Sequence, residues 1–143
     1  MDKHLVFVYG SLRRGNALSM PVRFPGARLM GEARVGGRLY DLGAFPGLAL
    51  GGSESSVAGE VYEVDEEALK RLDDFEASSR YRRERVEVSA VGGGRLECWV
   101  YVPEDGVEAY ARRTPVASGD WVEHLAAREG GGTSARPPDT DEP

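Results

Sequence analysis

The amino-acid sequence predicts a compact α+β domain built around a small, mostly antiparallel β-barrel. Most of its apolar segments have the length and composition of β-strands, and glycines interrupt several of them where a barrel must bend. One segment, which follows residue 65, has the periodicity of a convincing helix. The length of 143 residues suits a single domain with a hydrophobic core.

The predicted strands follow one another along the chain. Leu5–Tyr9 is a run of five apolar or aromatic residues without alternation, which is typical of a central strand covered on both faces. In residues 27–42, glycines interrupt short apolar stretches, and this pattern indicates bent or bulged strands. Val57–Val64 is a further strand candidate, with Gly59 inside it.

A helix is predicted to begin after Asp65, a good N-cap residue followed by two acids that suit the start of the helix dipole. Its apolar stripe consists of Ala68, Leu69, Leu72 and Phe75. Residues 85–91 and 96–102 then alternate apolar and polar positions on either side of three glycines, and this pattern predicts a β-hairpin. A short helical stretch that ends near Arg128 completes the predicted elements.

Composition and charge narrow the class of protein. The formal net charge of −6 argues against nucleic-acid binding through phosphate contacts. Cys98 is the only cysteine, so no intramolecular disulfide can form, which fits a reducing compartment. The N-terminal apolar run is too short for a signal peptide or a membrane span, and we expect a cytoplasmic protein that binds no membrane. Residues 129–143 lack large apolar side chains and are predicted to be a disordered tail, which leaves one domain over residues 1–128.

The loop after the first strand matches only half of a phosphate-binding loop. Gly10 and Gly15 have the spacing of that motif, but Asn16 and Ala17 stand where it needs lysine and a hydroxyl residue. A glycine at the end of a buried strand can instead let backbone amides converge on an anion or an oxyanion, and the two arginines at 13–14 would favour an anionic ligand. A plain tight turn with two solvated arginines is the alternative.

A carboxylate near the end of the predicted helix is a candidate for acid–base chemistry. Glu76 falls seven positions after Leu69 and four after Leu72, which puts it beside the apolar stripe, whereas Asp74 points outward and Asp73 lies at the flank. A partly desolvated carboxylate has a raised pKa and exchanges protons more readily near neutral pH. From the spacing alone, a helix that frays before this turn and leaves the carboxylate in solvent is an equal alternative.

Other residues that carry chemistry are less informative. His4 and His124 lie at opposite ends of the chain, and Cys98 alternates with apolar residues as a core residue would. No clustered histidine and cysteine spacing predicts a metal site. Tyr81 is a weaker candidate for lining a pocket.

Taken together, these segments resemble the γ-glutamylcyclotransferase-like (AIG2-like) superfamily. The resemblance rests on VFVYGSLRRG at residues 6–15 and LDDFEA at residues 72–77, with supporting matches at residues 81–82 and 118–121. It covers roughly residues 4–125. The fold that it implies is α+β, a small mixed, mostly antiparallel β-barrel with flanking helices.

The resemblance also implies a set of site residues. In the family, a Tyr-Gly-Ser/Thr-Leu loop binds the γ-glutamyl group, largely through backbone amides. In this sequence, that substrate-binding role falls on Tyr9, Gly10, Ser11 and Leu12. The catalytic acid/base of the family matches Glu76, and relatives commonly have glycine at the next position, where this chain has Ala77.

The reaction implied by the resemblance is an intramolecular cyclisation. Glu76 would take a proton from the α-ammonium group of the substrate, and the freed amine would attack the γ-carbonyl of the same molecule. The products would be 5-oxoproline and the free amine, and neither a metal nor an organic cofactor would be needed. The alternative hypothesis is a non-catalytic module that keeps the pocket for a small ligand. A monomer or a weak homodimer is adequate for either function.

Overall fold

The computed structural model describes residues 3–10, 12–13, 19–43, 45–51 and 55–130. Ser11 therefore lies outside the described residues, as do residues 131–143 of the tail predicted over residues 129–143. Residues 129–130 end a helix. None of the helices in these ranges is long and apolar enough to cross a membrane.

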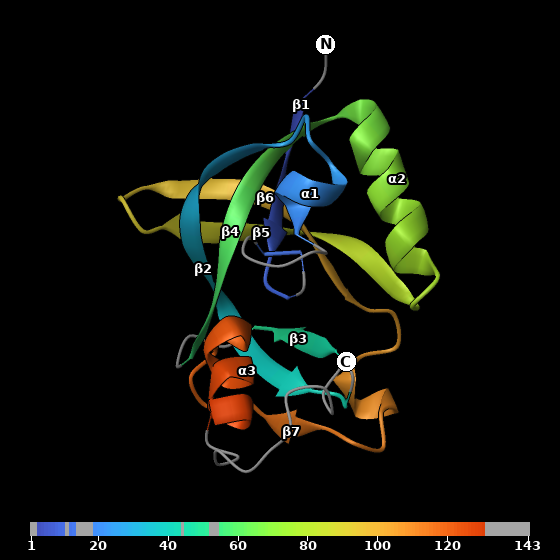
Figure 1. Cartoon of the computed structure of the whole chain (residues 1–143), viewed down its shortest axis with the longest axis vertical. Helices are drawn as coiled ribbons and strands as arrows, with labels where there is room; N and C mark the ends of the chain where they lie inside the picture. The colour runs from blue at the N-terminus through green and yellow to red at the C-terminus, as the bar shows by residue number, and fades with distance from the viewer. Residues whose placement is uncertain (1–2, 11, 14–18, 44, 52–54, 131–143) are drawn as a thin grey trace.

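The described residues form seven β-strands, three α-helices and a short 3-10 helix (Figure 1). The strands are β1 (Lys3–Val8), β2 (Arg28–Asp41), β3 (Pro46–Leu50), β4 (Ser56–Asp65), β5 (Tyr81–Ala90), β6 (Arg95–Pro103) and β7 (Thr114–Pro115). The helices are α1 (Met20–Arg23), α2 (Glu66–Ala77) and α3 (Trp121–Gly130), with the 3-10 helix at Val107–Ala109.

Five of the strands close into a barrel in the order β2-β4-β1-β6-β5. The ring closes because β5 also pairs with β2, with Ala33 opposite Ala90 and Arg34 opposite Ser89. The β1–β6 pair is parallel, and the other pairs of the ring are antiparallel. The predicted mixed, mostly antiparallel barrel is thus confirmed, as is the central place of the first strand.

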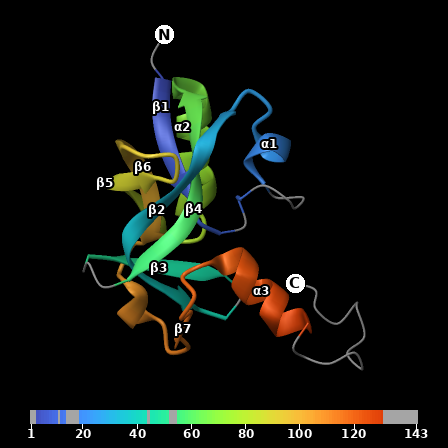
Figure 2. The same cartoon turned by 90° about the vertical axis from the view of Figure 1, so that its left-hand side faces the viewer.

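Strand β2 is long enough to belong to two sheets. Its first part pairs with β4, and a register shift between Leu29 and Gly31 marks the irregularity that its glycines predicted. Its last part, from Gly37 to Asp41, pairs with β3, and β7 adds to its end. Strands β3 and β7 lie with α3 at one end of the molecule, away from the barrel (Figure 2).

The hydrophobic core has two layers that share β1. Phe7 points into the barrel and packs with buried residues of the other strands, among them Cys98, as predicted for this cysteine. Val6 and Val8 point the other way and pack under the helices, against Leu72 of α2. Strand β1 is therefore covered on both faces, which explains why its sequence is apolar without alternation.

Candidate active site

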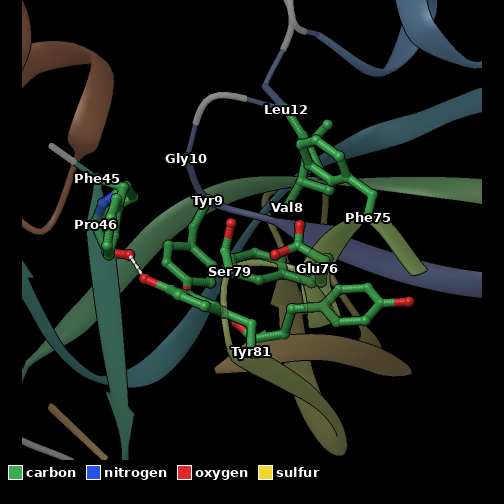
Figure 3. Close-up of a pocket in the computed structure, with 12 residues that line it drawn as sticks. Val8, Tyr9, Gly10, Leu12, Phe45, Pro46, Phe75, Glu76, Ser79 and Tyr81 are labelled. Carbon is green, nitrogen blue, oxygen red and sulfur yellow. Dashed lines mark hydrogen bonds between the residues drawn. The ribbon is translucent and has the colours of Figure 1, made fainter. Parts of the chain in front are cut away.

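A pocket of about 120 Å³ opens between the end of β1, the end of α2 and the segment that leads into β3. Its wall includes Tyr9, Gly10, Leu12, Phe45, Glu76 and Tyr81. Figure 3 shows Glu76 in the middle of these residues, with Leu12 and Phe75 on one side and Phe45 on the other. The two sequence segments that predicted a site therefore meet at one pocket.

The carboxylate of Glu76 is half-buried and has no hydrogen bond or ion pair with any other described residue. Burial raises the pKa of Glu76 to about 7, and the positive charge of Arg23 opposes part of this rise. A carboxyl group with this pKa is present in both protonation states at neutral pH, and so can accept a proton and return it.

Helix α2 holds Glu76 at the pocket through a capped first turn and a buried face. At its start, the side chain of Asp65 accepts a hydrogen bond from the backbone N–H of Ala68 at 2.8 Å, which confirms the predicted cap. Leu72 is fully buried one turn before Glu76. The helix continues to Ala77, which does not have a positive φ, so this position does not require glycine.

The loop after β1 faces Glu76 across the pocket and begins with a tight turn. The backbone N–H of Arg13 donates to the carbonyl oxygen of Gly10 at 3.0 Å. A Cβ at Gly10 would lie 2.7 Å from Cγ of Pro46, so no larger residue fits without a shift of the neighbouring segment. Leu12 is buried against the helices, and it lines the same pocket.

Arg13 anchors this loop to the barrel, and both sequence-based readings of its side chain were wrong. The side chain is buried, and it neither faces solvent nor is free for an anionic ligand. Its Nε donates to Glu60 of β4 at 3.2 Å, and a terminal nitrogen donates to Asp120 at 2.9 Å. Glu60 is only 2% exposed, so this is a buried, charge-assisted clamp on the loop.

Tyrosines surround the carboxylate, and their hydroxyl groups bind protein acceptors. Tyr9 donates to the carbonyl oxygen of Tyr101 at 2.7 Å, and Tyr101 donates to Asp73 at 2.7 Å. Tyr81 donates to the carbonyl oxygen of Pro46. Burial raises the pKa of all three phenols above the ordinary value, so they stay neutral. Tyr9 and Tyr81 line the pocket, as their sequence positions suggested.

The sequence did not indicate several residues of this pocket. Phe45, Pro46 and Tyr101 lie in segments without a recognisable motif, and they reach the site only through the pairing of β3 and β6 with the rest of the fold. Conversely, the two histidines do not reach it. His4 contacts Glu66 at 2.7 Å, and His124 contacts the carboxylate at position 41 at 2.9 Å, on other parts of the molecule.

Comparisons with known proteins agree with this geometry. The chain matches the family described as gamma-glutamyl cyclotransferase, AIG2-like, over residues 6–123. A Vibrio cholerae protein, provisionally named a gamma-glutamylcyclotransferase, is 39% identical over 126 residues, which cover 86% of this chain and 99% of that protein. The gamma-glutamylaminecyclotransferase of Bos taurus is 39% identical over 109 residues, which cover 67% of this chain and 63% of that protein.

A solved structure supports the same relationship. The crystal structure of an AIG2-like protein from Mus musculus matches this fold with a TM-score of 0.63 and 32% identity, over 71% of this chain and 78% of that chain. The matched residues 6–123 include both the loop after β1 and Glu76. The chain therefore belongs to the gamma-glutamyl cyclotransferase, AIG2-like family of enzymes.

Proposed function

We propose that this protein cyclises a γ-glutamyl amine or peptide, releasing 5-oxoproline and the free amine. The observation that carries the proposal is Glu76, a carboxyl group with a pKa of about 7 across the pocket from the loop at Gly10. The other pocket-lining residues that the structure describes carry no charge. The bovine relative, which is named as a gamma-glutamylaminecyclotransferase, supports the same class of substrate.

Glu76 is the catalytic acid/base in this proposal. A glutamate with a pKa of about 7 instead of 4.5 is a stronger base, so proton transfer to it from the α-ammonium group of the substrate is less unfavourable than transfer to an ordinary carboxylate. The freed amine attacks the γ-carbonyl carbon of the same molecule and closes the five-membered ring. Over the whole reaction the attacking nitrogen loses two protons and the leaving nitrogen gains two, while Glu76 accepts and returns them and ends ionised.

The loop after β1 is the substrate-binding element of the proposal. The segment Tyr9, Gly10, Ser11 and Leu12 would hold the γ-glutamyl group through backbone amides, which can also stabilise the oxyanion that forms when the γ-carbonyl is attacked. The buried clamp made by Arg13 supports this role, because amides stabilise an oxyanion only if they are held in place before the reaction. The hydroxyl of Tyr9 already donates to a main-chain carbonyl, so Tyr9 would contact the substrate with its ring rather than with its hydroxyl.

Both reacting groups belong to one molecule, so the pocket has to select a folded conformation of the substrate. The apolar and aromatic wall around Glu76 favours a compact ligand and excludes water from the attacking amine. No step of the proposed chemistry calls for a redox change or a second substrate.

The experiment that tests this proposal is an assay of purified protein with a panel of γ-glutamyl compounds. The panel contains γ-glutamyl amino acids, γ-glutamyl alkylamines and γ-glutamyl-ε-lysine, and released 5-oxoproline is measured by mass spectrometry. We expect turnover of at least one class. Saturable binding without any 5-oxoproline would instead support the alternative of a non-catalytic binding module and overturn the enzymatic proposal.

A further inference from the structure

Arg23 is a half-buried residue at the end of α1 that does not itself line the pocket but contacts a residue that does. Its guanidinium carbon lies 4.3 Å from the centroid of the Phe75 ring. Phe75 precedes Glu76 in the sequence, and both residues line the pocket. Stacking on an aromatic ring occupies the face of a guanidinium group and leaves its in-plane N–H donors free to bind an acceptor.

Within the described ranges, no side chain forms a hydrogen bond or an ion pair with Arg23. Arg13 and Arg83, by contrast, each bind a carboxylate of the protein. A guanidinium group that is fixed by stacking but has no carboxylate partner can bind an anionic ligand without first breaking an internal ion pair.

The charge of Arg23 acts on the place where the proposed reaction starts. It lowers the pKa of Glu76, against the larger effect of burial, although the two groups do not form an ion pair. In a γ-glutamyl substrate, the α-amine and the α-carboxylate are attached to the same carbon atom. A substrate whose amine reaches Glu76 therefore brings its carboxylate into the same neighbourhood.

The other side of Glu76 has a different character. Phe45 packs edge-on against Tyr81 and Tyr110, with ring centroids 5.9 and 6.0 Å apart. The described pocket-lining residues on that side carry no charge (Figure 3). An anionic group is thus favoured near Phe75, and the apolar part of a leaving amine is favoured near Phe45.

We propose that Arg23 is a further substrate-binding residue, whose guanidinium group binds the α-carboxylate of the γ-glutamyl substrate; this assignment rests on the proposed function. This assignment fixes the orientation of the substrate in the pocket. The α-carboxylate lies toward α1, the α-amine lies at Glu76, and the leaving amine lies toward Phe45.

The first test measures binding without turnover. The probes are 5-oxoproline, which keeps the carboxylate, and 5-oxoprolinamide, in which a neutral amide replaces it, each titrated by calorimetry at pH 7. We expect the parent protein to bind the acid about 10- to 100-fold more tightly than the amide. Arg23→Gln should remove most of this preference while leaving the affinity for the amide within about threefold, and Arg23→Lys should keep part of it.

The chain offers a matched control for this variant. Arg71 also stacks on a phenylalanine, with its guanidinium carbon 5.2 Å from the centroid of Phe24, but Phe24, unlike Phe75, does not line this pocket. Arg71→Gln removes the same charge and a similar stacking contact. It should leave the preference for 5-oxoproline over its amide unchanged.

The second test separates the assignment from the proposed function. A γ-glutamyl alkylamide and its α-carboxamide analogue are compared as substrates of the parent and of Arg23→Gln, and we expect the variant to lose kcat/KM mainly on the substrate with the carboxylate. An equal loss on both compounds, or an unchanged binding preference for 5-oxoproline, would overturn the assignment. A parent that shows the binding preference but cyclises no γ-glutamyl compound would overturn the proposed function and leave the assignment of Arg23 standing.

Discussion

Replacing Glu76 with glutamine is the most informative single change in this protein. Glutamine has nearly the same shape and can pack in the same place beside Phe75, but it cannot accept a proton from the α-ammonium group. The change therefore separates the chemistry of this side chain from its packing. Its effect on activity and its effect on stability are expected to have opposite signs.

The effect on stability follows from the raised pKa. Burial raises the pKa of Glu76 from 4.5 to about 7, so the folded protein resists ionisation of this group. The raised pKa therefore lowers the free energy of unfolding. This loss of stability is absent below about pH 4.5, grows as the pH rises toward 7, and is constant above that. At about 1.4 kcal/mol for each pKa unit the full penalty is on the order of 3 kcal/mol, and solvent at the open pocket reduces it to about 1–2 kcal/mol.

We therefore expect Glu76→Gln to be more stable than the parent at pH 8, by about 1–2 kcal/mol, and equal to it at pH 4. Urea denaturation at the two pH values measures this difference directly. In the same preparation, release of 5-oxoproline from the best substrate should fall by roughly a hundredfold or more, which is the usual scale for loss of a general acid–base group.

Asp74→Asn is the matched control, because Asp74 lies two residues earlier on α2 and is exposed. It should change neither the activity nor the pH dependence of stability. Asp73 is a poorer control than its place in the sequence suggests, because it accepts a hydrogen bond from Tyr101 and pairs with Arg83 at 3.1 Å. Parental turnover by Glu76→Gln, in a folded sample, would refute the assignment of the catalytic carboxylate.

Three further changes test other parts of the structure. Gly10→Val places a branched side chain against Pro46, and we expect lost affinity for 5-oxoproline in calorimetry while cooperative unfolding persists; parental affinity would contradict a binding role for this loop. Tyr101→Phe removes the hydrogen bond to Asp73 and should lower the free energy of unfolding by about 1 kcal/mol in urea. Burial alone would raise the pKa of Asp41, but hydrogen bonds from His124 and Gly43 and the positive charge of Arg128 lower it below 3.8. The ionised carboxylate therefore stabilises the folded protein, and this stabilisation is lost as the pH falls through the pKa that Asp41 has in the folded state. Asp41→Asn should accordingly destabilise the protein at pH 7 more than at pH 3 in thermal unfolding, and an equal effect at both would contradict this linkage.

The fold was predictable from the sequence wherever a segment carried its own signal. Three such signals predicted local structures that are present: the unbroken apolar run of β1, the cap at Asp65 and the alternation on either side of three glycines. Helix α1 and strand β3 gave no such signal. Helix α1 has four residues and begins at Met20, which is too short for a period of 3.6 residues to show, and β3 is an edge strand of five residues that starts with a proline.

The candidate site was predictable only in part, for a related reason. The glycine at the end of β1 and the carboxylate at the end of α2 are recognisable from local spacing. The aromatic wall and the partners of Arg13 are not, because they depend on which strands become neighbours. Arg13 illustrates this dependence. In the sequence it is an arginine in a glycine-rich loop, which predicts a solvated side chain, but in the fold it is buried and binds Glu60 of β4.

The meeting of the loop with Glu76 has a simple geometric origin. Strand β4 runs antiparallel to β1, with Lys3 opposite Asp65, so α2 begins beside the start of β1. The twelve residues of α2 span about 18 Å at 1.5 Å per residue, and the six residues of β1 span about 20 Å at 3.3 Å per residue. The helix therefore returns along most of the strand, and its last turn lines the same pocket as Gly10. Glu76 lies in this last turn and lines the pocket with Gly10, whereas Asp73, three residues earlier on α2, binds Tyr101 and Arg83 instead.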